Sequence, residues 1–368
     1  GSMNLDIVLL LAQDGLTNGA IYALLALALV MVFAVTRVIF VPQGEFVAFG
    51  ALTLASFQGN KLPGTLWLLL LAGSICFLMD WRYQQGLGKG MARRLRWSLM
   101  WQVLFPLGLA LLVFFLQSSP LGLAKLPLWV QMLLALLVVV PLGPMIYRLA
   151  FQPMAQAPIL VLLIVSVAVH LVLVGIALVF FGAEGSRTPP FSEGGFALGS
   201  VPVQAQTLWV LGTSLLFMIA LGLFFERSLF GKALRATAVN QTGARLMGIA
   251  PVFAGRLVFL LAALMGTYSG MLIGPITTIY YDTGFLIGLK GFVGAIIAGL
   301  ASYPLAVGGA LLVGLLEAYS SFWASSFKEV IGCTIFLNFF NKNILFTSIS
   351  LYFNNRLINS LWFRFCLF

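Results

Sequence analysis

The chain has 368 residues, of which 61% are hydrophobic and only 8% are charged. A soluble domain is about 25% charged, so this chain has too little polar surface for a water-soluble enzyme, a nucleic-acid-binding protein or a disordered linker. It carries 20 Lys and Arg against 10 Asp and Glu, a net charge of +10, which in a membrane protein indicates basic cytoplasmic loops. The composition predicts an all-α, polytopic integral membrane protein.

Apolar runs follow one another along the chain, and at about 20 residues per span they allow roughly 8–10 transmembrane segments. The last run is too long for one span, contains many glycines and is divided by Tyr303-Pro304, which favours short or broken helices that pack closely or line a cavity. In chain order the runs fall at about 14–35, 38–58, 64–80, 97–117, 128–147, 157–181, 206–226, 252–274 and 288–323, the last as 288–300 with 304–323, and a further run follows after residue 329.

Two basic loops set the expected orientation. The stretches 81–96 and 226–256 carry five Lys or Arg each, together half of the total. Four expected spans separate them, so both loops can face the cytoplasm. The segment 182–205, with many Gly, Pro and Ser, then falls on the outer side.

Charged side chains inside apolar runs are costly, so Glu45 and Glu317 are functional candidates. The sequence leaves two interpretations open for each of them. The carboxylate lines a substrate pathway or gate, or it accepts hydrogen bonds from a neighbouring helix and fixes the packing. His170, in the middle of a span, is expected to be a hydrogen-bonded packing residue.

The other charges near these runs receive plainer interpretations. Asp80 and Asp282 lie at span ends, where we expect them to be solvated. Lys290 is expected to be an anchor at the membrane boundary.

Catalytic and metal-binding signals are missing from the sequence. His170 is the only histidine, and the three cysteines, Cys76, Cys333 and Cys366, have no metal-ligand spacing. No motif for nucleophilic catalysis or phosphate binding is present. The sequence therefore predicts no catalytic residue, no metal site and no enzyme.

The stretch from Gly231 to Ile249 is predicted to form two short helices in the second basic loop. Asn240 is a suitable N-cap for the second helix, and Gly248 and Pro251 are stop signals. Its small residues leave a surface that can enter a partner's cleft, and its arginines can pair with acids of that partner. An interfacial helix resting on anionic headgroups is the alternative.

The C-terminal segment 333–368 differs in composition from the rest of the chain. It has no Ala, Gly or Val but eight Phe and six Asn. This abrupt change favours a different coding origin, such as a reading-frame change or a fusion.

Several motifs occur in series along the chain. They are Asp14–Leu24, Gln43–Phe46, Gly231–Ala236, Ala244–Ile249, Gly288–Phe292, Gly308–Leu311 and Glu317-Ala318. Through these motifs the chain resembles the permease subunits of bacterial branched-chain amino-acid ABC importers over roughly residues 5–331, as one transmembrane permease domain. Two departures are Gln43, where many relatives have His, and the tail after residue 332.

The resemblance implies an inner-membrane subunit that works with a second permease, two ATP-binding subunits and a periplasmic substrate-binding protein. This subunit would be surrounded by membrane lipids, and it would not bind nucleic acid. ATP and Mg²⁺ would lie on the partner subunits, and no cofactor is expected in this chain. The loop 226–256 would be the coupling loop, and Arg235→Glu would uncouple ATP hydrolysis from transport. The coupling residues implied are Gly231, Lys232, Ala233, Arg235, Ala236, Asn240, Gly243, Ala244, Arg245 and Gly248.

The expected substrate is a hydrophobic, branched-chain amino acid. Because a zwitterion needs polar groups along its path, the candidates for the path are Asn18, Tyr22, Gln43, Glu45 and Glu317. Two alternatives are a permease for urea or short amides within the same family, and a stand-alone ion-coupled secondary transporter. The latter would need coupling-ion carboxylates within its spans, and the sequence has few.

Overall fold

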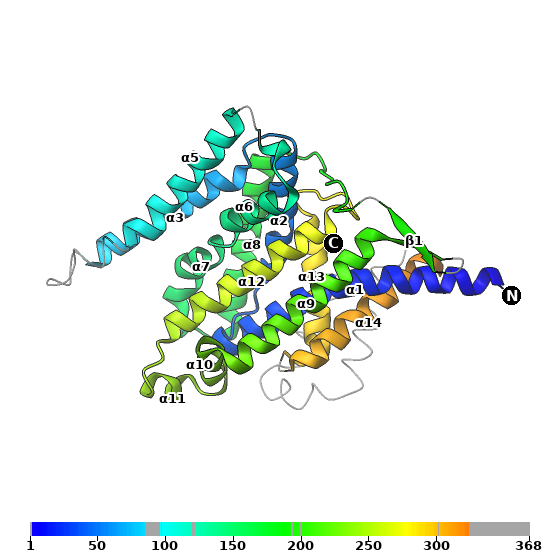
Figure 1. Ribbon diagram of the computed structural model, residues 1–368. Helices are drawn as coiled ribbons and strands as arrows, with labels where there is room; N and C mark the ends of the chain where they lie inside the picture. Colours follow the sequence, from blue (N-terminus) through cyan, green and yellow to red (C-terminus); the bar gives the residue numbers. More distant parts are fainter. Residues whose placement is uncertain are drawn as a thin grey trace. The chain divides into compact units, whose positions relative to one another are not determined.

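A computed structural model describes residues 2–84, 96, 98–119, 122–192, 194–198, 201–300 and 302–323. These residues are mostly helical (Figure 1). Eight of the described helical segments are long and apolar enough to cross a membrane, and two shorter helices, α2 and α13, accompany them. The predicted all-α, polytopic fold is confirmed. The segment 333–368, with Cys333 and Cys366, lies outside the described residues.

Helices make up most of the secondary structure along the chain. The α-helices are α1 (Ser2–Thr36), α2 (Gln43–Gln58), α3 (Gly64–Gln84), α5 (Phe105–Ser118), α6 (Leu128–Val139), α7 (Leu142–Ile146), α8 (Ile159–Phe181), α9 (Ala205–Arg227), α10 (Leu229–Val239), α11 (Gln241–Leu246), α12 (Pro251–Ile273), α13 (Thr283–Ile297) and α14 (Tyr303–Trp323). Short 3₁₀ or π segments are η1 (Met100–Leu104), η2 (Leu123–Lys125), η3 (Tyr147–Phe151) and η4 (Gln152–Met154). The strands are β1 (Gly195–Leu198) and β2 (Val201–Gln204).

The chain forms two compact units, each described by itself. The larger unit comprises Met31–Glu193 and Leu216–Leu289. The smaller unit comprises the described parts of Gly1–Val30, Gly194–Leu215 and Lys290–Phe368. Helices α1, α9 and α13 each contribute residues to both units.

The core of the larger unit forms where α2 packs on α12. Nearly every residue of α2 is buried, and the two helices approach so closely that a side chain on either would collide with the other backbone. A Cβ atom added at Gly50 would overlap the carbonyl oxygen of Thr267, and one added at Gly270 would overlap that of Val47. Small residues allow this approach within a membrane, where van der Waals packing is a main source of helix association.

Helices α1 and α2 are separated by a non-helical segment that packs inside the larger unit. Arg37 has a positive φ of 61°, and Pro42 precedes the first residue of α2. Proline lacks an N–H and restrains the residue before it, so the helix cannot continue through this point. The freed N–H of Val41 donates to Oγ of Ser166 on α8 at 2.9 Å. The span expected at 38–58 therefore begins as a helix only at residue 43.

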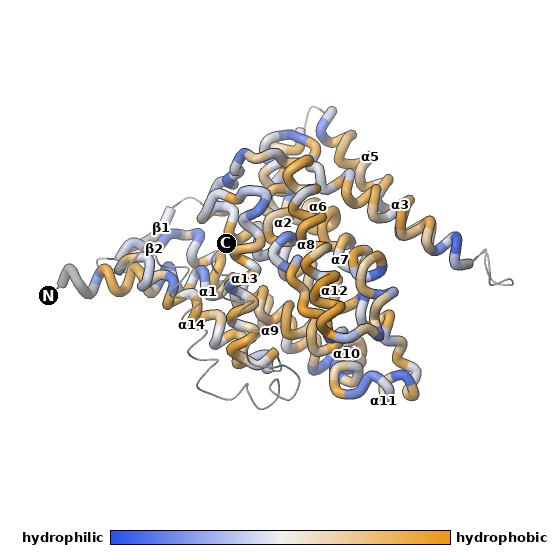
Figure 2. The backbone as a smooth tube through the Cα atoms, turned by 180° about the vertical axis from the view of Figure 1, so that it is seen from behind, coloured by the Kyte–Doolittle hydropathy of each residue, from blue (hydrophilic) through white to orange (hydrophobic). Residues whose placement is uncertain are grey.

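Hydropathy changes along the elements of the larger unit. Figure 2 shows α5, α8 and α12 as mainly hydrophobic, whereas α11 is mainly hydrophilic. On α8, Leu171, Val172 and Val179 are exposed, as expected for a helix that faces lipid or another membrane subunit. Helix α11 has the polarity of a segment that lies outside the bilayer core.

In the smaller unit, α1 packs on α14 through glycines. Gly15 and Gly19 of α1 contact the backbone of α14 near Leu315 and Leu311. Gly314 of α14 lies against the backbone of α1 at the same two glycines. The break expected at Tyr303-Pro304 is confirmed, because α13 ends at Ile297 and α14 begins at Tyr303. However, α13 begins at Thr283, which is earlier than the apolar run indicates.

Strands β1 and β2 form an antiparallel pair, with Gly195 opposite Gln204 and Leu198 opposite Val201. The sequence indicated only a polar outer segment at this point and missed the strands.

Two charge assignments made from the sequence are wrong. Asp80 is not solvated: it is buried, and its carboxylate pairs with Arg148. Lys290 is not a boundary anchor, since it lies in the middle of α13 and pairs with Glu317. In each case a partner far away in the sequence supplies the compensating charge, which offsets the desolvation cost of burying the first charge. Asp282 is exposed, as expected.

Candidate functional site

The loop between α9 and α12 forms two short helices, α10 and α11, as the sequence predicted. Asn240 caps α11, because its Oδ1 accepts a hydrogen bond from the N–H of Gly243 at 2.9 Å. Ser228 caps α10 in the same way through the N–H of Phe230. After α11, Gly248 has a φ of +84°, a conformation that glycine adopts without strain. These caps give the pair of helices, which we call the two-helix loop (residues 228–250), well-defined ends.

The two-helix loop is attached to three of the longer helices. Arg235 donates from Nη2 to the carbonyl oxygen of Phe225 at the end of α9, at 2.5 Å. Gln241 donates from Nε2 to the carbonyl oxygen of Val35 at the end of α1, at 2.8 Å. The ring of Phe230 lies 5.8 Å from that of Phe253 on α12, measured between centroids. The two-helix loop is therefore in contact with α1, α9 and α12.

An open hollow of about 490 Å³ lies on the two-helix loop. Apolar side chains form most of its wall, and polar groups are contributed by an arginine and an asparagine. Val239 is 85% exposed and Met247 is 83% exposed, and exposed apolar side chains of this size favour contact with a partner. The lining residues are Arg235, Ala236, Val239, Asn240, Gly243, Ala244, Met247 and Ile249.

Half of the residues implied for coupling line this hollow: Arg235, Ala236, Asn240, Gly243 and Ala244. The other five have different positions. Gly231 is buried where α10 crosses the end of α9, Gly248 forms the turn after α11, Ala233 is half-buried, and Lys232 and Arg245 are exposed.

Three lining residues, Val239, Met247 and Ile249, were missed by the sequence reasoning. Their only signal in the sequence is that they are apolar residues in a basic loop, and they share it with Leu229, Phe230, Leu234 and Leu246, which do not line the hollow.

The larger unit holds a buried Glu–His pair between α2 and α8. Glu45 is fully buried, and its Oε1 lies 2.9 Å from Nδ1 of His170. Its Oε2 is buried and has no hydrogen-bond partner in the part of the chain that the structure describes. The ring of His170 also packs on Phe285, with centroids 4.6 Å apart.

Gln43 is fully buried too, and donates from Nε2 to the carbonyl oxygen of Ala262 at 2.9 Å. The sequence named Glu45 and Gln43 and expected His170 to be hydrogen-bonded, but it did not pair Glu45 with His170.

The smaller unit holds a second charged cluster, where α1, α13 and α14 meet. Tyr22 donates its hydroxyl to Oε2 of Glu317 at 2.7 Å, and Lys290 donates from Nζ to Oε1 at 2.5 Å. Both oxygens of the Glu317 carboxylate are therefore engaged. Asn18, one helical turn before Tyr22, is half-buried. The predicted residues Tyr22 and Glu317 thus form one cluster within this unit.

Metal binding has no support among the described residues, in which no group of three or more His, Cys, Asp or Glu side chains is placed to hold an ion.

The apolar spans indicate a multi-pass integral membrane protein. In such proteins, charged residues within the spans often mark a transport pathway. A family described as branched-chain amino acid transport system / permease component matches residues 97–339, which are 243 of the 368 residues. The chain belongs to this family of permease components.

Individual relatives agree with the family. The chain is 28% identical over 204 residues to the high-affinity branched-chain amino acid transport system permease protein LivH of Escherichia coli (strain K12), covering 53% of this chain and 66% of LivH. It is 24% identical over 331 residues to BraD, a permease protein of the same description from Pseudomonas aeruginosa, covering 86% of this chain and 88% of BraD. No solved structure matches the chain.

Proposed function

We propose that this chain is a permease subunit of an ATP-driven importer for branched-chain amino acids in the bacterial inner membrane. It would form the translocation path with a second permease and receive substrate from a periplasmic binding protein. The observation that supports this proposal best is the two-helix loop, which carries an open, mostly apolar hollow while its side chains contact three long helices.

The mechanism we infer is mechanical coupling. A side chain of an ATP-binding subunit would fill the hollow and cover Val239 and Met247. When ATP binding draws two such subunits together, each would displace the two-helix loop. Since Arg235 and Gln241 attach the loop to α9 and α1, the displacement would move these helices and change which side of the membrane has access to the path. ATP would supply the free energy for this movement, because its contacts with the ATP-binding subunits differ between the two states.

For the path itself, the supporting observation is polarity inside the spans. In the larger unit, Glu45 offers a buried oxygen that has no hydrogen-bond partner among the described residues, which suits the ammonium group of a zwitterion, and Oε1 of Gln43 is buried and unpartnered there in the same way. In the smaller unit, the cluster of Tyr22, Glu317 and Lys290 and the neighbouring Asn18 supply further polar groups.

Substitution in the hollow tests the coupling proposal. In proteoliposomes that contain the complete transporter, Val239→Glu places a charge in the apolar contact. We expect ATP-dependent leucine uptake and co-purification of the ATP-binding subunits to fall by about tenfold or more, since an unpaired charge that loses water on docking costs at least about 1.4 kcal/mol.

The matched control is Thr242→Glu, which adds the same charge at an exposed position of α11 that does not line the hollow. It should leave uptake and co-purification close to those of the unmodified protein. Normal uptake by the Val239→Glu variant would contradict the coupling assignment. Uptake without ATP by the chain alone would contradict the whole proposal and favour a secondary transporter.

A further inference from the structure

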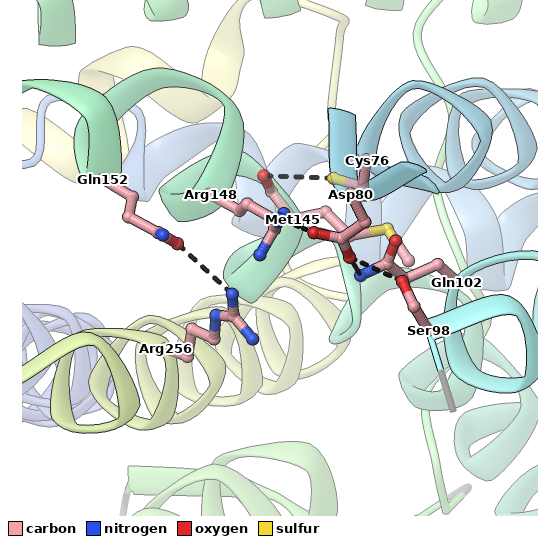
Figure 3. Close-up of polar contacts among 8 residues, drawn as sticks. All are labelled: Cys76, Asp80, Ser98, Gln102, Met145, Arg148, Gln152 and Arg256. Carbon is pink, nitrogen blue, oxygen red and sulfur yellow. Dashed lines mark hydrogen bonds and ion pairs between the residues drawn. The ribbon is translucent and has the colours of Figure 1, made fainter. Parts of the chain in front are cut away.

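A cluster of charged and polar side chains in the larger unit has no part in the proposed coupling or path. At its centre, the Asp80 carboxylate of α3 pairs with Arg148 of η3. Oδ2 of Asp80 also accepts hydrogen bonds from Ser98 at 2.5 Å and from Gln102 at 2.8 Å. Figure 3 shows this group of side chains. The Asp80 carboxylate is therefore fully engaged and has little capacity to neutralise a second cation.

A second cation, Arg256 of α12, lies beside this cluster (Figure 3). Its Nη2 donates to Oε1 of Gln152 at 3.4 Å, a long contact to a neutral group. Its Nε is buried with no hydrogen-bond partner among the described residues, as is Nε of Arg148. The charges of Arg148 and Arg256 repel each other. Among the described residues, the one carboxylate recorded beside these two guanidinium groups, that of Asp80, pairs with Arg148 and not with Arg256.

The electrostatics of this region therefore favour an additional anion. A buried or half-buried cation without a counter-charge is costly, because its lost hydration is not replaced. A guanidinium offers donors in a planar fork that matches the oxygens of a phosphate. One singly charged anion would balance the two arginines and Asp80.

The depth of the cluster indicates where this anion comes from. Arg256 is the sixth residue of α12, about 8 Å along the helix from its start at roughly 1.5 Å per residue. Arg148 lies six residues before the end of the Leu128–Met154 segment, about 9 Å by the same measure. Lipid headgroups occupy a layer of roughly 5–8 Å on each side of the hydrocarbon core. The two-helix loop lies beyond the start of α12, so a protein docked on it would be farther out.

We propose that Arg256, with Arg148 beside it, binds the phosphodiester of an anionic phospholipid. The bound headgroup would lie between α12 and the η3–η4 segment and would relieve the repulsion between the two arginines. Basic pockets between membrane helices are suited to such headgroups. The lipid would thus stabilise the packing of η3–η4 against α12 at the end of the bundle from which the two-helix loop emerges.

Thermal unfolding in nanodiscs tests this proposal. The unmodified protein should unfold at a higher midpoint temperature as phosphatidylglycerol replaces phosphatidylcholine, since a ligand that binds only the folded state stabilises it. Arg256→Gln should lose this dependence. In pure phosphatidylcholine the variant should be at least as stable as the unmodified protein, because the repulsion with Arg148 is gone.

The matched control is Arg82→Gln, which removes one positive charge from an exposed position at the end of α3; it should keep the dependence on phosphatidylglycerol. A dependence that persists in Arg256→Gln overturns the proposal. If Arg256→Gln does not fold, Arg256→Lys, which keeps the charge without the fork, should show a weaker dependence and retain less phospholipid through purification. Equal retention and an unchanged dependence would overturn the proposal.

Two further outcomes would assign the anion to another source and overturn the lipid assignment. The first is equal stabilisation of the unmodified protein by inorganic phosphate in pure phosphatidylcholine. The second is no lipid dependence together with loss of the ATP-binding subunits from Arg256→Gln, which would identify a carboxylate of a partner protein.

Discussion

At the scale of single residues, the Glu45–His170 pair distinguishes a packing role from a transport role. Glu45→Gln keeps the size of the side chain and removes its charge. We expect its stability to change by no more than about 1 kcal/mol, since removing a charge from a buried pair also removes its desolvation cost. If Glu45 receives the substrate ammonium, the KM for leucine uptake should rise about tenfold or more. Uptake kinetics and thermal unfolding of the same preparation separate the two effects.

The reciprocal variant, His170→Ala, leaves the carboxylate of Glu45 buried without its partner. It should lower the stability by about 1–3 kcal/mol. Asp282→Asn, at an exposed carboxylate, serves as the control and should change neither quantity. A normal KM for leucine uptake in Glu45→Gln would mean that Glu45 has a role in packing and none in substrate binding.

The sequence alone indicated which polar residues inside the spans are important, but it did not indicate which residues they contact. Glu45, Glu317 and His170 stand out because a polar side chain in an apolar run is rare and costly. Their pairing depends on residues that are not near neighbours in the sequence: Glu45 and His170 are 125 positions apart, and Glu317 and Lys290 are 27 apart. The expectation for Asp80 failed for the same reason, because the end of an apolar run does not show whether Arg148 lies beside it.

At the scale of elements, the contact between α2 and α12 depends on glycine. Gly270→Ala adds a methyl group where it would overlap the carbonyl oxygen of Val47. Since neither backbone can move without separating the two helices, we expect a loss of about 1–3 kcal/mol in the free energy of unfolding. Chemical denaturation in detergent micelles measures this change.

A glycine of α8 supplies the matched control. Gly175 has no atom within 4 Å of an added Cβ, so Gly175→Ala should be neutral or should stabilise its helix by up to about 1 kcal/mol. Equal effects of the two substitutions would mean that close packing does not explain the glycine at position 270.

Local chemistry made several elements predictable from the sequence. Asn240 as an N-cap, Gly248 as a stop and the break before Pro304 all act within a few residues, and each prediction was confirmed. The short strands β1 and β2 were not predicted, because their sequences do not alternate clearly between polar and apolar residues. The start of α2 was displaced, since Pro42 acts within a run that is otherwise apolar.

At the scale of the whole molecule, orientation in the membrane links every functional assignment. The two-helix loop and the segment 182–192 are separated by a single described span, α9. They must therefore lie on opposite sides of the bilayer if α9 crosses it. The basic residues in and around α10 and α11 predict that the loop faces the cytoplasm, where an ATP-binding subunit could reach it.

Cysteine labelling tests this orientation directly. Cys76 is buried, so a background with Cys333→Ser and Cys366→Ser should react weakly with a membrane-impermeant maleimide. Lys232→Cys, at an exposed position of α10, should then be labelled in inside-out vesicles but not in intact spheroplasts. Glu184→Cys, exposed in the segment after α8, should show the reverse pattern. Labelling of both from the same side would mean that α9 does not cross the membrane, whereas labelling of Lys232→Cys from the periplasm alone would place the hollow out of reach of any ATP-binding subunit.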